Sequence, residues 1–460
     1  MTETGSLNLE GMEILVLGLG MSGRSAAQFC AERGARVLAA DERSADALFE
    51  APESEIARKL GPQVELVCGQ PFPDPSRFDL VVPSPGIPPS RYAEAASRVW
   101  GDIELAGRAL AIPVIAVTGT NGKSTTVRLI EAMLNTAGRR AEAAGNVGTP
   151  ALSLPGKPLD VAVLEVSSFQ LEAIESFAPQ VAVILNITPD HLDRHGDLAG
   201  YSAAKRRILE NQGPGDVAVL DFDNPLVRGF AEHARGEVIP FSRQTPPSLP
   251  NHPRAAWIDA GVATFADGHT LERVPLTSGS GLSPHDRDNV LAALTAAWAA
   301  GVAPTSASQA LSDFQALPHR CEVVPAPGPV RWINDSKATN PGAAQRAIEG
   351  SEAPVIWIAG GRGKGLSFES LAEVAQGRVK IALLIGESSD ALSEVLEGRV
   401  PWEPCGDLDT AVDRAASLAD AGDIVLLAPA CASFDQFKSF EHRGECFRAA
   451  VGRLDEESPV

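Results

Sequence analysis

One stretch, residues 112–130 (IPVIAVTGTNGKSTTVRLI), constrains the fold of this chain more than any other. The apolar run 114–117 predicts a buried strand, the glycine-rich GTNGKST predicts a turn, and a helix-compatible run begins at Lys123. In such a turn the backbone N–H groups of residues 119–123 can converge on phosphate oxygens, helped by the positive end of the helix dipole. The stretch therefore predicts an α/β domain that binds phosphate groups.

The residues that follow the turn suit a nucleoside triphosphate. Lys123 is expected to reach the β and γ phosphates, and a hydroxyl of Ser124 or Thr125 to ligate Mg²⁺. The strict eight-residue P-loop pattern requires a glycine where Val117 stands, so GTNGKST is a shortened variant. The alternative is a tight strand-to-helix turn with a solvated lysine. The order of glycine, lysine and two hydroxyls favours phosphate binding.

Length and charge limit the classes of function. A chain of 460 residues predicts about three domains at about 150 residues each. A formal charge of −20 opposes phosphodiester backbones and anionic lipids, so we expect neither nucleic acid nor membrane as a partner. The six cysteines show no metal-type spacing, no apolar run is long enough to span a bilayer, and residues 1–10 hold no signal-like segment. We expect a cytoplasmic protein, and a monomer.

The first hundred residues predict a second phosphate-binding turn. A strand at 12–17 leads into GLGMSG, and a helix follows. A second strand at 36–40 ends at Asp41, about twenty positions after the glycine motif. G-x-G-x-x-G suits a diphosphate, which NAD and UDP-sugars both carry, and Asp41 and Arg43 could serve a ribose, a uracil or an adenosine. A third strand, 78–82, leads into the rigid loop Ser84-Pro85-Gly86, and a helix at 101–107 ends the domain.

The middle of the chain predicts a metal site beside the phosphate loop. A strand at 161–166 carries Glu165 at its end, and a strand at 181–187 leads into the loop of His191. Carboxyl ends of parallel strands share one edge, so Glu165 and His191 would face Ser124 as a Mg²⁺-holding set. A satisfied loop carboxylate and a surface histidine are the alternatives. Lys205 lies in a helix-like segment where a lysine is normally solvated.

Two further regions carry candidate ligand contacts. A helix at 283–299 places Asp286 and Asn289 in its first turn, and could be a capped structural helix. Beyond a boundary at 314–329, strands at 330–333, 355–359, 381–385 and 424–428 predict a third open α/β sheet with polar loops at its carboxyl edge. Lys337 and Lys364 lie in these loops and are either anion contacts or surface charges.

Taken together, the motifs resemble the Mur ligase family over nearly the whole chain. They are, in order, GLGMSG, SPG, GDIEL, GTNGKST, GNVG, EVSSFQ, NITPDHLDRH, YSAAK, LPHR, NDSKATNP, GGRGKG and PACASFDQFKSFEHRG. The resemblance implies an α/β fold of three domains, with N- and C-terminal Rossmann-like open sheets around a central P-loop-type ATPase. The expected boundaries are 1–110 for the UDP-substrate, 111–317 for ATP and 318–460 for the amino acid.

The resemblance also implies a reaction, ATP-dependent amide formation in peptidoglycan synthesis and hence in growth of the cell wall. The carboxylate of UDP-N-acetylmuramoyl-L-alanine would take the γ-phosphoryl group of ATP, and the amine of D-glutamate would attack the acyl phosphate. The C-terminal PACASFDQFKSFEHRG favours D-glutamate over the amino acids of other family members. The rivals are another Mur-family ligase, a folylpolyglutamate synthetase, an NAD-dependent oxidoreductase suggested by GLGMSG, and a non-catalytic nucleotide-binding protein.

Four groups of site residues follow from the resemblance. The UDP-substrate would meet Gly18, Gly20, Ser22, Gly23, Asp41, Arg43, Ser84, Gly86 and Asn146. ATP would meet Gly119, Thr120, Asn121, Gly122, Lys123, Ser124, Thr125, Asn289, Arg320 and Asp335. D-Glutamate would meet Lys337, Thr339, Lys364, Ser433, Phe434 and Phe440.

The fourth group would hold two Mg²⁺ ions. Ser124 and Glu165 would ligate one, and His191 with Lys205 as its carbamate would ligate the other, because a lysine ammonium with a pKa of about 10.4 cannot bind a cation. Lys123, Glu165, His191 and Lys205 form the implied catalytic set. Asp286, where some relatives have asparagine, and the extra charge of Arg362 receive no role.

Overall fold

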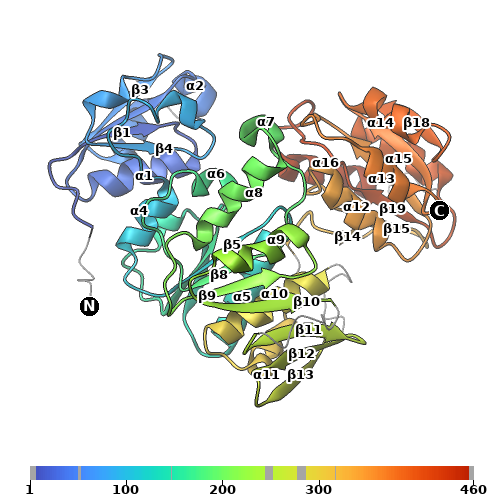
Figure 1. Cartoon of the computed structure of the whole chain (residues 1–460). Coiled ribbons are helices and arrows are strands. Elements are labelled where there is room, and N and C mark those ends of the chain that lie inside the picture. The colour runs from blue at the N-terminus through green and yellow to red at the C-terminus, as the bar shows by residue number, and fades with distance from the viewer. Residues whose placement is uncertain are drawn as a thin grey trace. The chain divides into compact units, whose positions relative to one another are not determined.

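The computed structural model describes residues 7–49, 53–146, 148–243, 252–276, 286–315 and 317–454. It contains three sheets with helices, so the predicted α/β class is confirmed (Figure 1). The chain forms two compact units. The first consists of Met1–Ile187, Ser202–Leu276 and Asp288–Leu311, and the second of Thr188–Tyr201, Thr277–Arg287 and Ser312–Val460.

The N-terminal sheet of the first unit is parallel, with the order β3-β2-β1-β4. Buried aliphatic side chains of β1 and β4, such as Leu15, Leu17 and Val81, form its core, as expected for strands covered on both faces. The predicted βαβ unit is confirmed. The elements are β1 (Glu13–Leu17), α1 (Met21–Ala31), β2 (Arg36–Asp41), α2 (Ala45–Leu48), α3 (Glu53–Leu60), β3 (Val64–Cys68), η1 (Pro75–Arg77), β4 (Leu80–Pro83), η2 (Pro89–Arg91) and α4 (Asp102–Ala109).

The middle sheet has nine strands in the order β13-β12-β11-β10-β9-β8-β5-β7-β6. The pairs from β6 to β11 are parallel, and β12 and β13 add an antiparallel edge. The strands are β5 (Val114–Thr118), β6 (Ala141–Gly145), β7 (Val161–Glu165), β8 (Val181–Ile184), β9 (Val217–Asp221), β10 (Glu237–Ser242), β11 (Ala255–Asp259), β12 (Val262–Ala266) and β13 (Leu271–Pro275).

Most of the remaining helices of the first unit surround this sheet. The predicted helix 283–299 begins at Arg287, so Asp286 precedes it, and residues 283–285 lie outside the described part of the chain. Helix α8 begins in the second unit and ends in the first. The elements are α5 (Lys123–Thr136), η3 (Ala151–Ser153), α6 (Ser168–Leu171), α8 (Leu198–Arg206), η4 (Arg207–Leu209), α9 (Pro225–Gly229), η5 (Phe230–His233), α10 (Arg287–Ala299), α11 (Pro304–Ala307) and η8 (Ser308–Leu311).

The sheet of the second unit has the order β14-β15-β19-β16-β17-β18, parallel except for β14. Alternate residues of β16 enter two different cores, Trp357 on one face and Ile356 and Ile358 on the other, which explains its unbroken apolar run. The predicted third sheet is confirmed. The elements are α7 (Leu192–His195), β14 (Glu322–Val324), β15 (Arg331–Asn334), α12 (Pro341–Glu349), β16 (Val355–Gly360), α13 (Glu369–Ala375), β17 (Val379–Ile385), α14 (Ser389–Leu396), β18 (Trp402–Gly406), α15 (Leu408–Leu418), β19 (Ile424–Leu427) and α16 (Phe440–Arg453).

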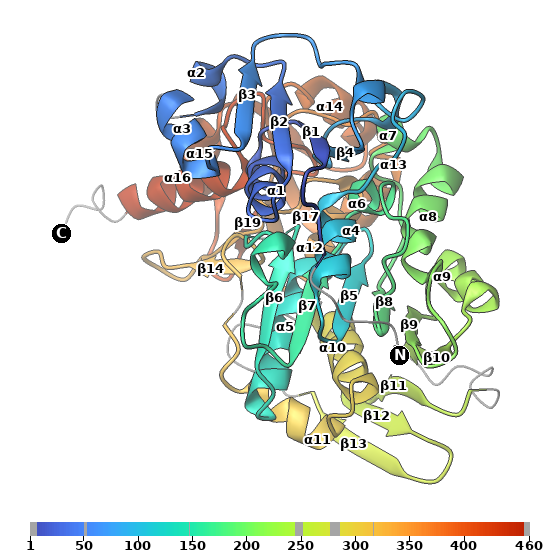
Figure 2. The same ribbon diagram turned by 90° about the vertical axis from the view of Figure 1, so that its left-hand side faces the viewer.

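Helix α4 joins the N-terminal sheet to the middle sheet, and it lies beside α6 in both views (Figures 1 and 2). The side chain of Glu104 is fully buried and accepts hydrogen bonds from the N–H groups of Glu175, Ser176 and Phe177 at 2.9–3.0 Å. A buried carboxylate is costly unless it is hydrogen-bonded, so this contact fixes α4 on the loop after α6. Among the described helices, none is long and apolar enough to cross a membrane.

Candidate active site

The phosphate loop runs from β5 into α5, as predicted, and glycine is required at both ends of it. Gly119 and Gly122 have φ values of 150° and 87°. A Cβ at Gly119 would lie 3.0 Å from Leu185 Cβ, and a Cβ at Gly122 would lie 2.1 Å from Asn289 Oδ1. Asn289 therefore lies against the loop, as expected for a residue that contacts the same ligand.

Asn186, at the end of the neighbouring strand, holds this loop in place. Its backbone carbonyl accepts from Thr120 N at 2.7 Å, its Oδ1 accepts from Asn121 N at 3.0 Å, and its Nδ2 donates to Asn121 O at 3.1 Å. In this structure the N–H groups of Thr120 and Asn121 thus donate to Asn186. The convergence of N–H groups of residues 119–123 on phosphate stays a prediction.

Two lysines meet at one carbonyl oxygen of the loop. Lys123 Nζ donates to Gly119 O and Thr120 O at 2.9 Å, and Lys205 Nζ donates to Gly119 O at 2.8 Å. The side chain of Lys205 is 1% exposed, so the alternative that it is a solvated surface residue is wrong. A buried ammonium group is costly to keep. The hydrogen bond to Gly119 O partly offsets this cost and places Lys205 at the phosphate loop.

Glu165 lies on the strand next to the phosphate loop. It is paired in register with Val117 of β5, and its side chain is 2% exposed. Its Oε1 accepts from Asn146 Nδ2 at 3.0 Å, whereas its Oε2 is buried with no hydrogen-bond partner among the described residues. A buried carboxylate oxygen without a donor is expensive. The alternative of a satisfied loop carboxylate is therefore wrong.

A magnesium ion fits this environment. Mg²⁺ prefers oxygen ligands and usually combines one or two carboxylates with phosphate oxygens of the substrate. The buried hydroxyl of Ser124 and the unpaired oxygen of Glu165 are ligands of this kind. No group of three or more His, Cys, Asp or Glu side chains positioned for a metal occurs in the described ranges. The protein ligands would thus need nucleotide oxygens to complete the site.

The N-terminal glycine loop also has the predicted form. A Cβ at Gly23 would lie 1.8 Å from Gly18 O, and Ser84 Oγ donates to the same carbonyl at 2.8 Å, so the two loops touch. Asp41 is buried and accepts from Leu19 N at 2.8 Å and from the Arg43 guanidinium. Burial alone would raise the Asp41 pKa, but the hydrogen bonds from Arg43 and Leu19 hold it below its usual value.

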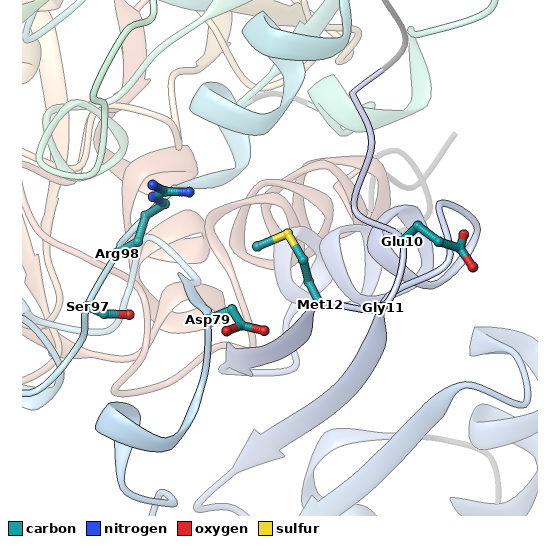
Figure 3. Close-up of a pocket in the computed structure, with 6 residues that line it drawn as sticks. All are labelled: Glu10, Gly11, Met12, Asp79, Ser97 and Arg98. Carbon is teal, nitrogen blue, oxygen red and sulfur yellow. The ribbon is translucent and has the colours of Figure 1, made fainter.

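Gly20 and Gly86, two further predicted members of this group, occupy open positions in the two N-terminal loops. A Cβ at Gly20 or Gly86 would meet no heavy atom of the described residues within 4 Å, so a ligand can approach the backbone there. A separate pocket of about 520 Å³ lies at the opposite ends of β1 and β4, and contains none of the predicted site residues (Figure 3). It is lined by Glu10, Gly11, Met12, Asp79, Ser97 and Arg98.

In the second unit, the loop of His191 is tied to the C-terminal sheet. Asp190 is 5% exposed, and its carboxylate accepts from Lys364 Nζ and from Asn340 Nδ2, both at 3.1 Å. Lys364 is therefore held in a half-buried ion pair, and its interpretation as a solvated surface charge is wrong. His191 follows Asp190 with φ at 52°, a conformation that is uncommon outside glycine.

The loops predicted to meet the amino acid come together at the carboxyl edge of this sheet. Arg362 and Ala432 exchange backbone hydrogen bonds of 2.9 and 3.0 Å, which joins the loop of Lys364 to the loop of Ser433. The ammonium of Lys337 lies 3.7 Å from the centre of the Phe440 ring. Ser433 is buried, and Phe434 is 64% exposed. Thr339 lies two residues beyond Lys337, and its N–H donates to the Lys337 carbonyl.

Arg443 organises the same loops, although no pattern in the sequence singled it out. Its side chain is fully buried, with Nε donating to Ser336 Oγ at 3.0 Å and Nη1 donating to Cys431 O at 3.2 Å. The side chain of Arg362 instead forms an exposed ion pair with Glu387 at 2.8 Å. This ion pair accounts for the extra charge in GGRGKG.

Arg320 and Asp335 lie close together, and Asp335 directly follows β15 at the carboxyl edge of the same sheet. Burial raises the Asp335 pKa to about 6, while the positive charges of Arg320 and Arg346 act against the rise. Asp286, whose role the sequence left open, adds a negative charge that raises this pKa further. The pair could meet polar groups of a nucleotide, as predicted.

Comparison with known proteins identifies the family. The descriptions "Mur ligase MurD-like, N-terminal domain", "Mur ligase middle domain" and "Mur ligase, glutamate ligase domain" match residues 12–101, 117–297 and 319–431. A protein of Anaeromyxobacter dehalogenans, named UDP-N-acetylmuramoylalanine--D-glutamate ligase, is 42% identical over 96% of this chain and 97% of its own length. The chain belongs to the Mur ligase family. A Myxococcus xanthus protein of the same name is 40% identical over 98% of this chain and 100% of its own length.

Solved structures of other Mur ligases share the fold. MurF ligase from Thermotoga maritima, in complex with ADP, has a TM-score of 0.60 at 19% identity and covers 98% of this chain and 97% of its own. A pseudomurein peptide ligase type C from Methanothermus fervidus has a TM-score of 0.59 at 18% identity, covering 96% and 100%. At such identities the likeness concerns the fold alone. Asn186, Asp190 and Arg443 themselves lie within the motifs that first indicated a Mur ligase.

Proposed function

We propose that this chain is the ATP-dependent ligase that joins D-glutamate to UDP-N-acetylmuramoyl-L-alanine in peptidoglycan synthesis. Relatives of about 40% identity over their full length carry the name of this activity. The observation that supports the chemistry is the convergence of Lys123 and Lys205 on Gly119 O, in the loop after β5. The paired strand β7 carries Glu165, whose Oε2 has no partner among the described residues. Two ammonium groups lie at the predicted phosphate-binding loop, and a carboxylate lies on the neighbouring strand.

Phosphoryl transfer leaves the protein little covalent work, so positioning and neutralisation of charge must lower the barrier. Lys123 would leave the carbonyls of Gly119 and Thr120 and donate to phosphate oxygens, which are better acceptors because they are charged. The alanyl carboxylate attacks the γ-phosphorus and ADP leaves. The amine of D-glutamate then attacks the acyl carbon of the acyl phosphate, and inorganic phosphate leaves.

We propose that Ser124 and Glu165 hold one Mg²⁺ ion, and that His191 and a carbamylated Lys205 hold a second. When bound, these ions neutralise the negative charge that gathers on the phosphate oxygens. Carbamylation would replace the buried Lys205 ammonium with an anion that can ligate a cation. In the unmodified chain, the Lys205 ammonium donates to Gly119 O at 2.8 Å.

The remaining contacts are proposed in three groups. The UDP-substrate would lie along the loops of Gly18 and Ser84 with Asp41, Arg43 and Asn146. ATP would extend from the phosphate loop to Asn289, Arg320 and Asp335. The D-glutamate carboxylates would meet Lys337, Thr339, Lys364, Ser433, Phe434 and Phe440. The domain boundaries 1–110, 111–317 and 318–460 stay predictions, as do a monomeric state, a cytoplasmic location and the absence of nucleic-acid and membrane partners.

A substrate-dependence assay tests the proposal. Release of ADP should require both UDP-N-acetylmuramoyl-L-alanine and D-glutamate, and should fall by at least about a hundredfold when L-alanine or a diamino acid replaces D-glutamate. Lys123→Met should abolish it. Lys157→Met is the matched control, because Lys157 pairs with Glu142 on the exposed surface of the same unit.

The same assay separates the rival functions. ADP release without D-glutamate, or equal use of another amino acid, would contradict the proposed specificity. A nucleotide-binding protein without catalytic activity would release no ADP under any combination. Binding of NADH at the glycine loop, seen as a change in its fluorescence, would favour an oxidoreductase.

A further inference from the structure

Asp102 has a buried carboxylate whose partners come from both sheets of the first unit. It is the first residue of α4 and is 5% exposed. Ser22, in the glycine loop, lies close enough to this carboxylate to act against the rise in its pKa. From the middle sheet, Gln170 Nε2 donates to Asp102 Oδ1 at 3.2 Å and to Oδ2 at 3.0 Å.

Gln170 extends this contact toward the phosphate site. Its Oε1 accepts from Ser167 N at 2.9 Å and from Ser167 Oγ at 3.1 Å, and its own N–H donates back to Ser167 Oγ at 3.2 Å. Ser167 comes two residues after Glu165 at the end of β7. Hydrogen bonds therefore lead from Asp102 through Gln170 to the segment that carries Glu165, and Ser22 of the glycine loop lies beside the Asp102 end of this series.

Joining the two sheets does not by itself require Asp102. Glu104, on the same helix, already binds the loop after α6 through three backbone N–H groups and the Ser176 hydroxyl. Burial raises the pKa of the Asp102 carboxyl although Gln170 and Ile103 donate to it, so keeping this group ionised in the junction is costly. Asp102 also lines a small cavity together with Ser84 of the second N-terminal loop and Gln170. It thus lies where both candidate substrate loops meet the middle sheet.

We infer that Asp102 and Gln170 are positioning residues that couple occupancy of the glycine loop to the placement of the Glu165 carboxylate. The inference rests on the proposed function. A ligand diphosphate at the glycine loop competes for the Ser22 hydroxyl and draws it away from Asp102. The Asp102 carboxylate then accepts more strongly from Gln170 Nε2. Gln170 in turn fixes Ser167 and the end of β7. By linkage, bound UDP-substrate and the Mg²⁺–nucleotide must change each other's affinity by the same factor.

Exchanging the two side chains tests the coupling. In Asp102→Asn an NH2 group replaces the oxygen that accepts from Gln170 Nε2 at 3.0 Å, which leaves only the longer contact of 3.2 Å. In Gln170→Glu a carboxylate faces the Asp102 carboxylate. Either change alone therefore weakens the match. The double variant restores one amide donor opposite one carboxylate, and the carboxylate introduced at position 170 can still accept from Ser167. We expect the wild-type chain to bind Mg²⁺ and a non-hydrolysable ATP analogue at least about fivefold more tightly with UDP-N-acetylmuramoyl-L-alanine present.

The titrations should then separate the variants. The coupling factor is the ratio of the affinities for Mg²⁺ and the ATP analogue with and without UDP-N-acetylmuramoyl-L-alanine. Each single variant should lower this factor to about one, and the double variant should restore it. Glu104→Gln is the control: it weakens the same junction without touching Ser22 or Gln170, so it should lower stability and keep the factor. Should Gln170→Glu not fold, Gln170→Met, which has a similar length and no amide, serves in its place.

Two results would overturn the inference. One is a single variant that keeps the wild-type factor. The other is a folded double variant in which the factor stays at one. A wild-type chain that ligates D-glutamate but shows no coupling refutes the inference alone, whereas a wild-type chain that does not ligate D-glutamate refutes the proposed function.

Discussion

Replacing Gly122 with alanine should damage the phosphate loop in a way that can be separated from backbone strain. The new Cβ would lie 2.1 Å from Asn289 Oδ1 and 3.2 Å from Leu185 Cδ1, at a φ of 87°. Gly138, just beyond the other end of α5, has a φ of 82°, and a Cβ there meets no heavy atom of the described residues within 4 Å. Alanine at either position would therefore suffer the same backbone strain from a positive φ, but only alanine at position 122 would clash with neighbouring atoms.

The expected magnitudes follow from this difference. A left-handed conformation costs a non-glycine residue roughly 1–2 kcal/mol, which applies to both variants. Forcing an extra methyl group into a packed site costs roughly 1–3 kcal/mol, which applies only to Gly122→Ala. If the loop moves to relieve the clash, kcat/KM for ATP should fall about 5- to 150-fold below that of Gly138→Ala, at about 1.4 kcal/mol for each factor of ten.

Steady-state kinetics with ATP as the varied substrate, and hydrogen exchange of peptides from α5, measure the two effects. Gly122→Ala combined with Asn289→Ala should recover most of the protection of α5 seen in Gly138→Ala, because the closest clash, with the Asn289 side chain, is gone and only the contact of 3.2 Å with Leu185 Cδ1 stays. It should not recover ATP use, since Asn289 is itself proposed to contact ATP. Equal losses of stability and of kcat/KM in Gly122→Ala and Gly138→Ala would refute the reasoning.

Three further predictions concern charged groups. Glu165→Gln should raise the Mg²⁺ concentration needed for half-maximal ligation at least about tenfold, with little change in thermal unfolding; an unaltered Mg²⁺ titration would contradict the assigned ligand. Lys205→Ala should be inactive and regain activity with short carboxylic acids such as acetate, and a fully active variant would exclude the carbamate. Burial raises the Asp335 pKa from 3.8 to about 6, so its ionisation destabilises the fold above pH 6, and this penalty disappears as the pH falls to about 4. Asp335→Asn should therefore be more stable than the wild type by at most about 3 kcal/mol at pH 8 and no more stable at pH 3.5, as read by urea unfolding; a difference independent of pH would disprove the assignment.

Local patterns in the sequence predicted the parts of the site that local geometry determines. The strand, turn and helix around Lys123 follow from an apolar run, two glycines with positive φ and a helix start. The glycine loop near Gly18 follows in the same way. The end of β7 at Glu165 could be placed because carboxyl ends of parallel strands meet at one edge.

Contacts between distant residues could not be predicted in this way. Asn186 binds the backbone of Asn121 across 65 residues, and Asp190 holds Lys364 across 174. Each residue looks like an ordinary loop residue in the sequence, because its partner is determined only when the strands have paired. The burial of Lys205 is another example, since its segment reads as a helix with a solvated lysine.

The junction at α4 has a consequence for substrate choice. Since Glu104 anchors α4 to the loop after α6 through bonds to three successive N–H groups, the N-terminal sheet cannot slide along the middle sheet without losing them. The distance between the glycine loop and the phosphate loop is then held constant by the backbone. A substrate bound at the glycine loop would be selected by whether its length brings its carboxylate to the phosphate loop. This selection would not depend on the incoming amino acid.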